Sequence, residues 1–118
     1  MEEINDISKW GAFVEKLIIK TANDQIIWSI DTNATRDDSN GPIYSSLVND
    51  YKYIAIYRSI YRYYFDEDEY EFRNDITVQI VDHMGEILWR LPSLAPAKRL
   101  IDLIEFELSD AQSLLDDF

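Results

Sequence analysis

The chain has 118 residues, with 23 acidic side chains against 11 basic ones, a formal net charge of -12 and no cysteine. This length suits one hydrophobic core, so we expect a single domain over residues 1–118. The lack of cysteine excludes disulfides, thiolate metal sites and a cysteine nucleophile. The negative charge repels duplex nucleic acid and anionic membranes, so neither is expected as a direct partner.

Hydropathy predicts a folded, cytoplasmic protein. Hydrophobic residues make up 47% of the chain, which favours a packed domain over a disordered acidic chain. No run approaches the roughly 18 apolar residues of a membrane span, and the first residues lack the basic and apolar regions of a signal peptide. We therefore expect the cytoplasm as its location and no membrane partner.

The first predicted element is a helix that is capped by Asn5 or Ser8 and ends near Thr21. Apolar residues recur in it at three- and four-residue spacing, which is typical of a helix with one buried face. Asn23 and Asp24 are expected to end it.

Short strands are predicted over residues 25–30 and 43–48, on either side of a loop. The first has Ile26, Trp28 and Ile30 on one side. Residues 31–42 are polar and rich in turn-forming types, so we expect a loop that is the most mobile part of the chain.

Two long strands, residues 51–65 and 70–80, form the centre of the predicted fold. In the second, apolar and polar residues alternate, which predicts one buried face and one wet face. Four acids at residues 66–69 mark the turn between the strands. A further turn at residues 82–85 leads to a last strand over residues 87–91.

A C-terminal helix is predicted to begin near Pro96, because proline suits the first helical turn. Its apolar face is expected to run from Leu100 to Phe118, with an acidic outer face. Ser109 and Asp110 could instead cap a separate last helix from Ala111. The predicted fold class is therefore α+β: an N-terminal helix, an antiparallel meander of about five strands and a C-terminal helix or helix pair, in a two-layer sandwich.

Residues that could carry chemistry are few. His83 titrates near neutrality, but it sits in a predicted turn where neighbouring Asp82 would point away. The acids at residues 66–69 could attract calcium, yet they lack the glycine and ligand spacing of an EF-hand loop. The three glycines are isolated, which argues against a phosphate-binding loop. We expect no catalytic, cofactor-binding or metal-binding residue, and no enzyme.

Residues 51–65 are the unusual stretch, with seven aromatics and no acid. One interpretation is structural: the tyrosine rings edge the core, and Arg58 and Arg62 pair with Glu71 or its neighbours across the hairpin. A second is a protein-binding surface, since tyrosine and arginine are frequent in binding hot spots. Stacking of single-stranded bases is a third, which the negative charge disfavours.

The leading hypothesis is a small, non-enzymatic protein-binding module of bacterial or phage type. It would act as an adaptor or inhibitor of a protein with a basic surface, such as a nucleic-acid-handling protein whose phosphate ligand its acids imitate. The alternative is a homodimeric chaperone-like or structural module joined through the tyrosine-rich strand. The candidate acidic contacts are Asp66, Glu67, Asp68, Glu69, Glu71, Asp102 and Glu105, and the candidate aromatic and basic contacts are Tyr57, Arg58, Tyr61, Arg62 and Tyr64.

Overall fold

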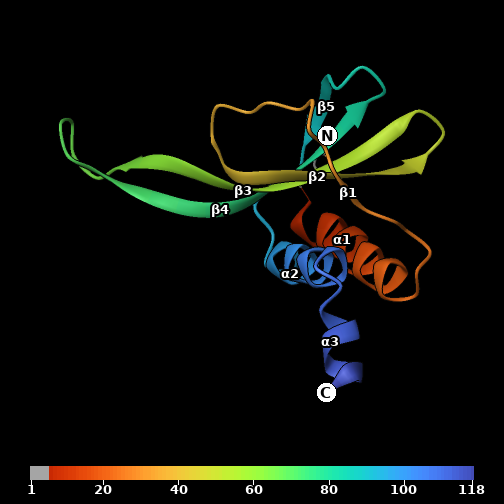
Figure 1. Ribbon diagram of the computed structural model, residues 1–118. Coiled ribbons are helices and arrows are strands. Elements are labelled where there is room, and N and C mark those ends of the chain that lie inside the picture. Colours follow the sequence, from red (N-terminus) through yellow and green to blue (C-terminus); the bar gives the residue numbers. More distant parts are fainter. Residues whose placement is uncertain (1–5) are drawn as a thin grey trace.

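The computed structural model describes residues 6–118, and within them three helices and five strands are formed (Figure 1). In chain order these are α1 (Ile7–Ala22), β1 (Ser29–Ile30), β2 (Ser39–Asn49), β3 (Lys52–Tyr64), β4 (Tyr70–Asp82), β5 (Ile87–Arg90), α2 (Pro96–Leu108) and α3 (Ala111–Asp117). The sheet is an antiparallel meander in the order β1-β2-β3-β4-β5. The predicted α+β class, with its meander and C-terminal helix pair, is confirmed.

Helix α1 forms as predicted, but its cap is a different residue. The Asp6 carboxylate accepts a hydrogen bond from the backbone N–H of Lys9 at 3.1 Å, which satisfies a donor that a helix start leaves free. Ser8 lies inside the first turn, and Asn5 lies outside the described residues. The cap therefore precedes Ser8 by two positions.

Helices α1 and α2 lie against one face of the sheet (Figure 1). The main core forms between these helices and the sheet. Buried apolar side chains of both helices, β2, β3, β4 and the adjoining segments meet there. The members of this cluster are Val14, Leu17, Ile26, Trp28, Tyr44, Ile54, Ile56, Val78, Leu91, Leu94, Ala97, Leu100, Ile101 and Ile104. Their burial is the main force that holds the helices to the sheet.

The predicted strand over residues 25–30 is mostly irregular, and only Ser29 and Ile30 pair with β2. Ile26 and Trp28 are buried in the main core, and the Trp28 indole N–H donates to Thr21 Oγ1 at 2.9 Å. Ile30 is 52% exposed, so the three residues do not share one buried side. Because Ile26 and Trp28 pack against the helices, the segment before Ser29 does not pair with β2.

The predicted loop over residues 31–42 is shorter, because its last residues belong to β2. Residues 31–38 cross the sheet face opposite the helices (Figure 1). The buried Tyr57 hydroxyl donates to the Asp38 carboxylate at 2.7 Å, and Arg36 Nε donates to Gln79 Oε1 at 3.0 Å. Burial and the bond to Asp38 raise the pKa of Tyr57 to about 12. This segment therefore covers a second, smaller cluster on that face.

The prediction of one wet and one buried face along β4 is wrong. At the base of the strand both faces are covered: Val78 and Gln79 are 2% and 3% exposed on opposite sides. At the other end neither is covered, since every residue from 61 to 74 is exposed. Side chains point to alternate faces along the whole of β4. Other elements pack against those faces only at the base, so burial does not follow the alternation.

The C-terminal segment takes the two-helix alternative. Asp110 adopts a left-handed backbone conformation with φ of 55°, which separates α2 from α3. Figure 1 shows α3 extending away from the sheet. Leu108, Leu115 and Phe118 are therefore exposed, and the single apolar face predicted from Leu100 to Phe118 is not formed. No helix among the described residues is long and apolar enough to span a membrane.

Candidate functional site

The outer ends of β3 and β4 and the turn between them project from the sheet as a two-stranded arm (Figure 1). We define the arm as residues 60–74. It contains six aromatic residues, all of them exposed. They are Tyr61, Tyr63, Tyr64, Phe65, Tyr70 and Phe72, with exposed fractions between 41% and 60%.

The arm projects because its neighbours stop short of it. Strand β2 makes its last pair with β3 at Ser39 and Ser59, and β5 makes its last pair with β4 at Arg90 and Gln79. After Arg90 the chain turns through Pro92 into α2, which lies under the base of the sheet (Figure 1). Beyond these points a few single hydrogen bonds reach the strands, such as Ile60 N–H to the Asp38 carbonyl and Leu91 N–H to the Val78 carbonyl, and from residue 61 to residue 73 β3 and β4 pair only with each other among the described residues.

Two faces of the arm follow from the register of its strands. Arg62 lies opposite Phe72 and Tyr64 lies opposite Tyr70, so all four share the face that continues the helix side of the sheet. On this face the rings of Tyr64 and Tyr70 have centroids 5.4 Å apart, and those of Tyr70 and Phe72 are 5.6 Å apart. Such cross-strand aromatic pairs stabilise a hairpin that is marginal by itself.

The two arginines of the arm are held by its own side chains. Arg62 Cζ lies 4.9 Å from the centroid of the Tyr70 ring, and Arg73 Cζ lies 3.4 Å from that of Tyr63. Arg73 also pairs with Glu71 at 2.8 Å. The hydrogen bond to Glu71 raises the pKa of Arg73, and the one to Tyr64 raises the pKa of Arg62. The arm therefore presents flat aromatic rings backed by guanidinium groups.

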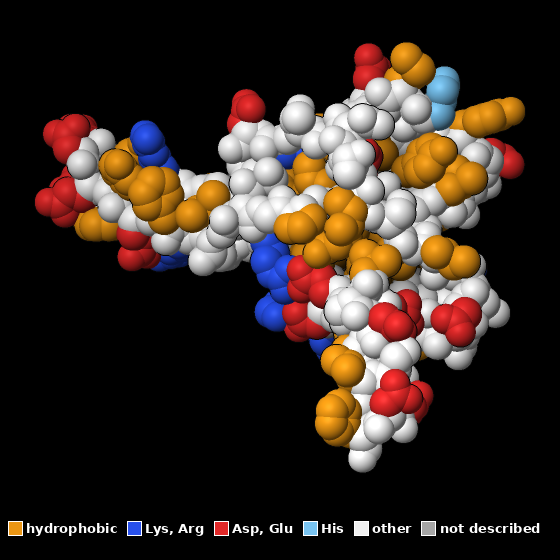
Figure 2. Space-filling model, in the orientation of Figure 1, with side chains coloured by type: hydrophobic (Ala, Val, Ile, Leu, Met, Phe, Trp, Pro, Cys, Tyr) orange, Lys and Arg blue, Asp and Glu red, His pale blue; other side chains and the backbone are white. Residues whose placement is uncertain are grey.

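The tip of the arm is acidic. Asp66, Glu67, Asp68 and Glu69 are all exposed, and Figure 2 shows red carboxylates at the end of the arm beside orange side chains. The Asp66 carboxylate accepts the backbone N–H of Glu67 at 2.7 Å and so supports the turn. Within residues 6–118 no group of three or more acids or histidines could hold a metal ion. A negative rim therefore borders the aromatic surface.

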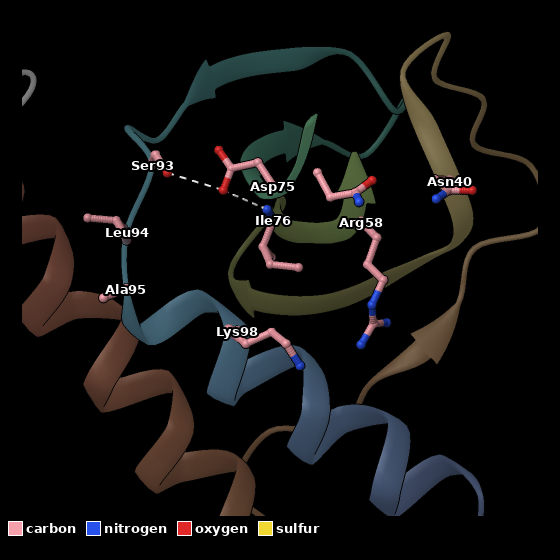
Figure 3. A pocket seen from close by; sticks show the side chains of 9 residues that line it. Asn40, Arg58, Asp75, Ile76, Ser93, Leu94, Ala95 and Lys98 are labelled. Carbon is pink, nitrogen blue, oxygen red and sulfur yellow. Dashed lines mark hydrogen bonds between the residues drawn. The ribbon is translucent and has the colours of Figure 1, made fainter. Parts of the chain in front are cut away.

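A cavity of about 530 Å³ lies where the arm leaves the body of the protein (Figure 3). We call it the corner cavity. Its floor includes Arg58 and Ile76 on β3 and β4, and its wall includes Leu94 and Lys98 near the start of α2. The Ser93 hydroxyl donates to the Asp75 carboxylate at 3.2 Å beside it. The cavity is thus open next to the base of the arm.

The cations of the corner cavity are already paired. Arg58 donates to Glu105 at 2.5 Å and to Asp102 at 3.2 Å, and Lys98 donates to Asp102 at 2.7 Å. The Tyr44 hydroxyl also donates to Glu105, at 2.8 Å. The hydrogen bond from Arg58 lowers the pKa of Glu105, while burial and the bond to Glu105 raise the pKa of Tyr44 to about 12. This network ties α2 to the sheet and leaves no spare cation for an anionic ligand.

The structure places the predicted acidic contacts in two groups. Those at residues 66–69 and Glu71 lie on the arm, whereas Asp102 and Glu105 lie on α2 and pair with Arg58 and Lys98. The α2 acids thus turn toward the sheet rather than forming the outer acidic face. Sequence reasoning missed this pairing, although the spacing of Lys98, Asp102 and Glu105 puts the three on one helix face.

The predicted aromatic and basic contacts are also divided. Tyr61, Arg62 and Tyr64 lie on the arm, whereas Tyr57 is 1% exposed beneath residues 31–38. Arg58 pairs with α2, not with Glu71 across the hairpin, and Arg62 stacks on Tyr70 instead of forming that pair. Phe65, Tyr70 and Phe72 join the arm surface. For Tyr70 and Phe72 the signal was that β4 has aromatic residues before Asn74 and Ile and Val after it.

His83 lies exposed in the turn after β4, where its ring contacts that of Tyr51 at a centroid distance of 6.1 Å. The Asp82 carboxylate accepts the backbone N–H groups of Met84 and Glu86, each at 2.9 Å, so it supports the turn. His83 borders a shallow hollow together with Asp31 and Arg36, but the neighbouring Asp82 carboxylate is bonded to the backbone of the turn and does not orient the imidazole.

Comparison with known proteins found no matching protein-family model, no matching curated protein and no matching solved structure.

Proposed function

We propose that this chain is a non-enzymatic protein-binding module whose arm is the contact element. It binds a protein with a basic surface and acts as an adaptor or as an inhibitor by occlusion. The observation that carries the proposal is the set of six exposed aromatic residues on a projecting hairpin with an acidic tip.

The aromatic surface supports a protein partner. Exposed apolar residues are ordinary when scattered, but a contiguous group on a projecting element is typical of an interaction site, and Tyr64, Tyr70 and Phe72 form such a group on one face of the arm. Tyrosine, phenylalanine and arginine are the types enriched at the centre of interfaces, because they bury much area with few rotatable bonds. Stacking of Arg62 and Arg73 on neighbouring rings holds this surface in one arrangement before binding.

The charge of the arm supports a basic partner. Residues 60–74 carry five acids against two arginines, and four of the acids gather at the tip. Acids at the outer end of an aromatic surface speed its encounter with a positive surface and disfavour acidic proteins. A nucleic-acid-handling protein is one class with such a surface, and occupation of its phosphate-binding groove by the tip would inhibit it.

The alternative is a homodimer in which two arms contact each other. The open strand edges of the arm favour this alternative, because unpaired edges readily pair with a second copy. The net charge of -12 on each copy opposes it, since the two acidic tips would approach each other.

The test is affinity capture from a lysate of the source organism with three forms of the chain. One is unaltered, and in the second residues 62–72 are replaced by Asn-Gly, which joins Tyr61 to Arg73 by a tight turn. The third carries Leu114→Ser and Leu115→Ser, a matched loss of exposed apolar residues on α3. We expect the first and third forms to capture the same partner and the shortened form to lose it.

Salt then separates the two contributions of the arm. Capture that declines as salt rises indicates the acidic tip, and capture that persists indicates the aromatic surface. Equal capture by the shortened form would contradict the proposal. Failure of every form to capture a partner, with a dimer in sedimentation that only the shortened form loses, would favour the homodimer instead.

A further inference from the structure

The backbone of the arm has an open edge on β4. The even-numbered residues of β4 direct their N–H and C=O groups away from β3, because Val78 accepts a hydrogen bond from the Leu91 N–H at 2.9 Å on that side. Asp82 donates on the same side, to the Glu86 carbonyl at 2.9 Å. Since this direction repeats every two residues, the backbone groups of Tyr70, Phe72 and Asn74 point outward as well.

No described residue pairs with those outward groups. Strand β5 occupies this edge only at the base, where it pairs with β4 from Val81 to Gln79. The chain leaves the edge after Leu91. On the arm side of the Leu91 contact, the Ile76 N–H donates to the Asp75 carboxylate at 2.8 Å. The open stretch therefore begins at Asn74 and ends at Tyr70, in line with β5.

The opposite edge of the arm is less open. The Ile60 N–H on β3 already donates to the Asp38 carbonyl at 2.9 Å. Only Arg62 and Tyr64 remain with outward backbone groups on that side. The corner cavity is lined by Asn74, Ile76 and Leu94 at the β4 edge, and it extends under β3 as far as Asn40 on β2. The β4 edge thus offers both more backbone groups and a place for a side chain.

We propose that the partner protein binds by adding an extended segment as a strand to the open edge of β4 between Tyr70 and Asn74. This inference rests on the proposed function and names the mode of binding. Backbone hydrogen bonds supply affinity in this mode, and pockets for alternate side chains supply specificity. The corner cavity receives one side chain at the inner end of the added strand.

Charge and surface define the chemistry of this segment. Side chains on the helix-side face of the added strand contact Tyr70 and Phe72, so they are apolar. The outer end lies beside the acids at residues 66–69 and Glu71, so it carries lysine or arginine. The paired cations of the corner cavity exclude a role as an anion site. The occupant is therefore an extended segment in which apolar residues alternate with polar ones, and which carries lysine or arginine.

The probe for this mode is a seven-residue peptide of alternating lysine and valine with blocked ends. We expect it to shift the backbone amide resonances of Tyr70, Phe72 and Asn74 in the full chain. Hydrogen exchange of those three amides should slow by about tenfold or more at saturation, because they gain bonding partners. N-methylation of the peptide at the residues whose N–H groups pair with β4 should abolish binding, and methylation of the intervening residues should not.

A matched pair of variants tests the same edge from the protein side. Asn74→Pro removes an N–H that points outward and is not bonded to β3, a position where proline is tolerated. Asn74→Ala keeps that N–H. We expect Asn74→Pro to weaken peptide binding about tenfold more than Asn74→Ala does, because the two variants share the loss of the Asn74 side chain beside the corner cavity and differ in the backbone N–H, with the amide spectrum of the base intact in both.

Three results would overturn strand addition. One is binding of the peptide that does not depend on which amides are methylated, and another is no change at the three arm amides at millimolar peptide. A third is protection of these amides without peptide in a form that sediments as a dimer, which would assign the edge to a second copy. If the captured partner is lost by the shortened arm but kept by Asn74→Pro, the proposed function stands and strand addition fails.

Discussion

Strands β3 and β4 pass through two environments, a base that other elements cover and an arm that they leave exposed. At the base, Ile56 and Tyr57 are 0% and 1% exposed on opposite faces of β3, because the helices cover one face and residues 31–38 the other. On the arm, Arg62 and Tyr63 occupy equivalent alternate positions and both are exposed. Alternation along a strand therefore does not determine burial, which depends on whether another element reaches that part of the strand.

The difference also explains the two compositions. The base uses Ile, Val and Ala with small hydroxyl residues such as Ser59 and Thr77, which bond to each other at 2.9 Å when buried. The arm uses Tyr, Phe, Arg and Glu, whose rings and stems pack locally while their polar ends reach water. A hairpin that must stay ordered without cover from either side needs such cross-strand pairs.

Truncation of one apolar side chain in each region should give the largest contrast in stability. We expect Ile56→Ala to lower the free energy of unfolding by about 2–5 kcal/mol, because it leaves a cavity in the main core. Phe72→Ala, at a residue that is 60% exposed, should change it by less than about 0.5 kcal/mol. Urea unfolding at neutral pH measures both. An equal loss in the two variants would mean that the arm is covered in solution.

Removal of one tyrosine hydroxyl in each region should give a smaller contrast. Tyr57→Phe loses the hydrogen bond from a buried hydroxyl to the partly exposed Asp38 carboxylate and should cost about 1 kcal/mol. Tyr63→Phe on the arm should be neutral within about 0.5 kcal/mol. Thermal or urea unfolding of the pair would check this. A neutral Tyr57→Phe would show that residues 31–38 add little to the sheet.

The smallest contrast is expected in how acid affects the stability contributed by a carboxylate of α2 and by one of the arm. The hydrogen bond from Arg58 lowers the pKa of Glu105 below its ordinary 4.5 in the folded state, so the unfolded chain binds a proton first as the pH falls. The stabilisation is complete above pH 4.5 and is lost as the pH falls through the lowered value. It should amount to about 1 kcal/mol or less, given partial exposure.

Glu105→Gln and Glu71→Gln provide the comparison. Between pH 6 and pH 3 the unaltered chain should lose about 1 kcal/mol or less beyond the loss of Glu105→Gln, since that variant lacks the titrating group. Glu71→Gln should follow the unaltered chain, because its pair with Arg73 is exposed. Urea unfolding as a function of pH measures both differences. If the free energy of unfolding depends on pH in the same way for all three forms, the ion pair between Glu105 and Arg58 does not contribute to stability.

Much of the fold follows from local pattern. The spacing of apolar residues predicted α1, and turn residues predicted the meander and the possible break before Ala111. The arm residues Tyr61, Arg62 and Tyr64 and the acids of the tip were identified as candidates from composition. Tyr57 and Arg58 belonged to the same candidate set, although the structure places one under a loop and the other against α2.

The sequence by itself determined the first helix, the long strands and the acidic aromatic hairpin, because turn chemistry and hydrophobic period act over a few residues. Tertiary structure decided where along β3 and β4 the cover ends. That boundary depends on contacts distant in sequence: Asp38 with Tyr57, Glu105 with Arg58, and the turn of the chain away from the sheet after Leu91. No local period encodes such distances, so only the folded chain separates the buried base from the exposed arm.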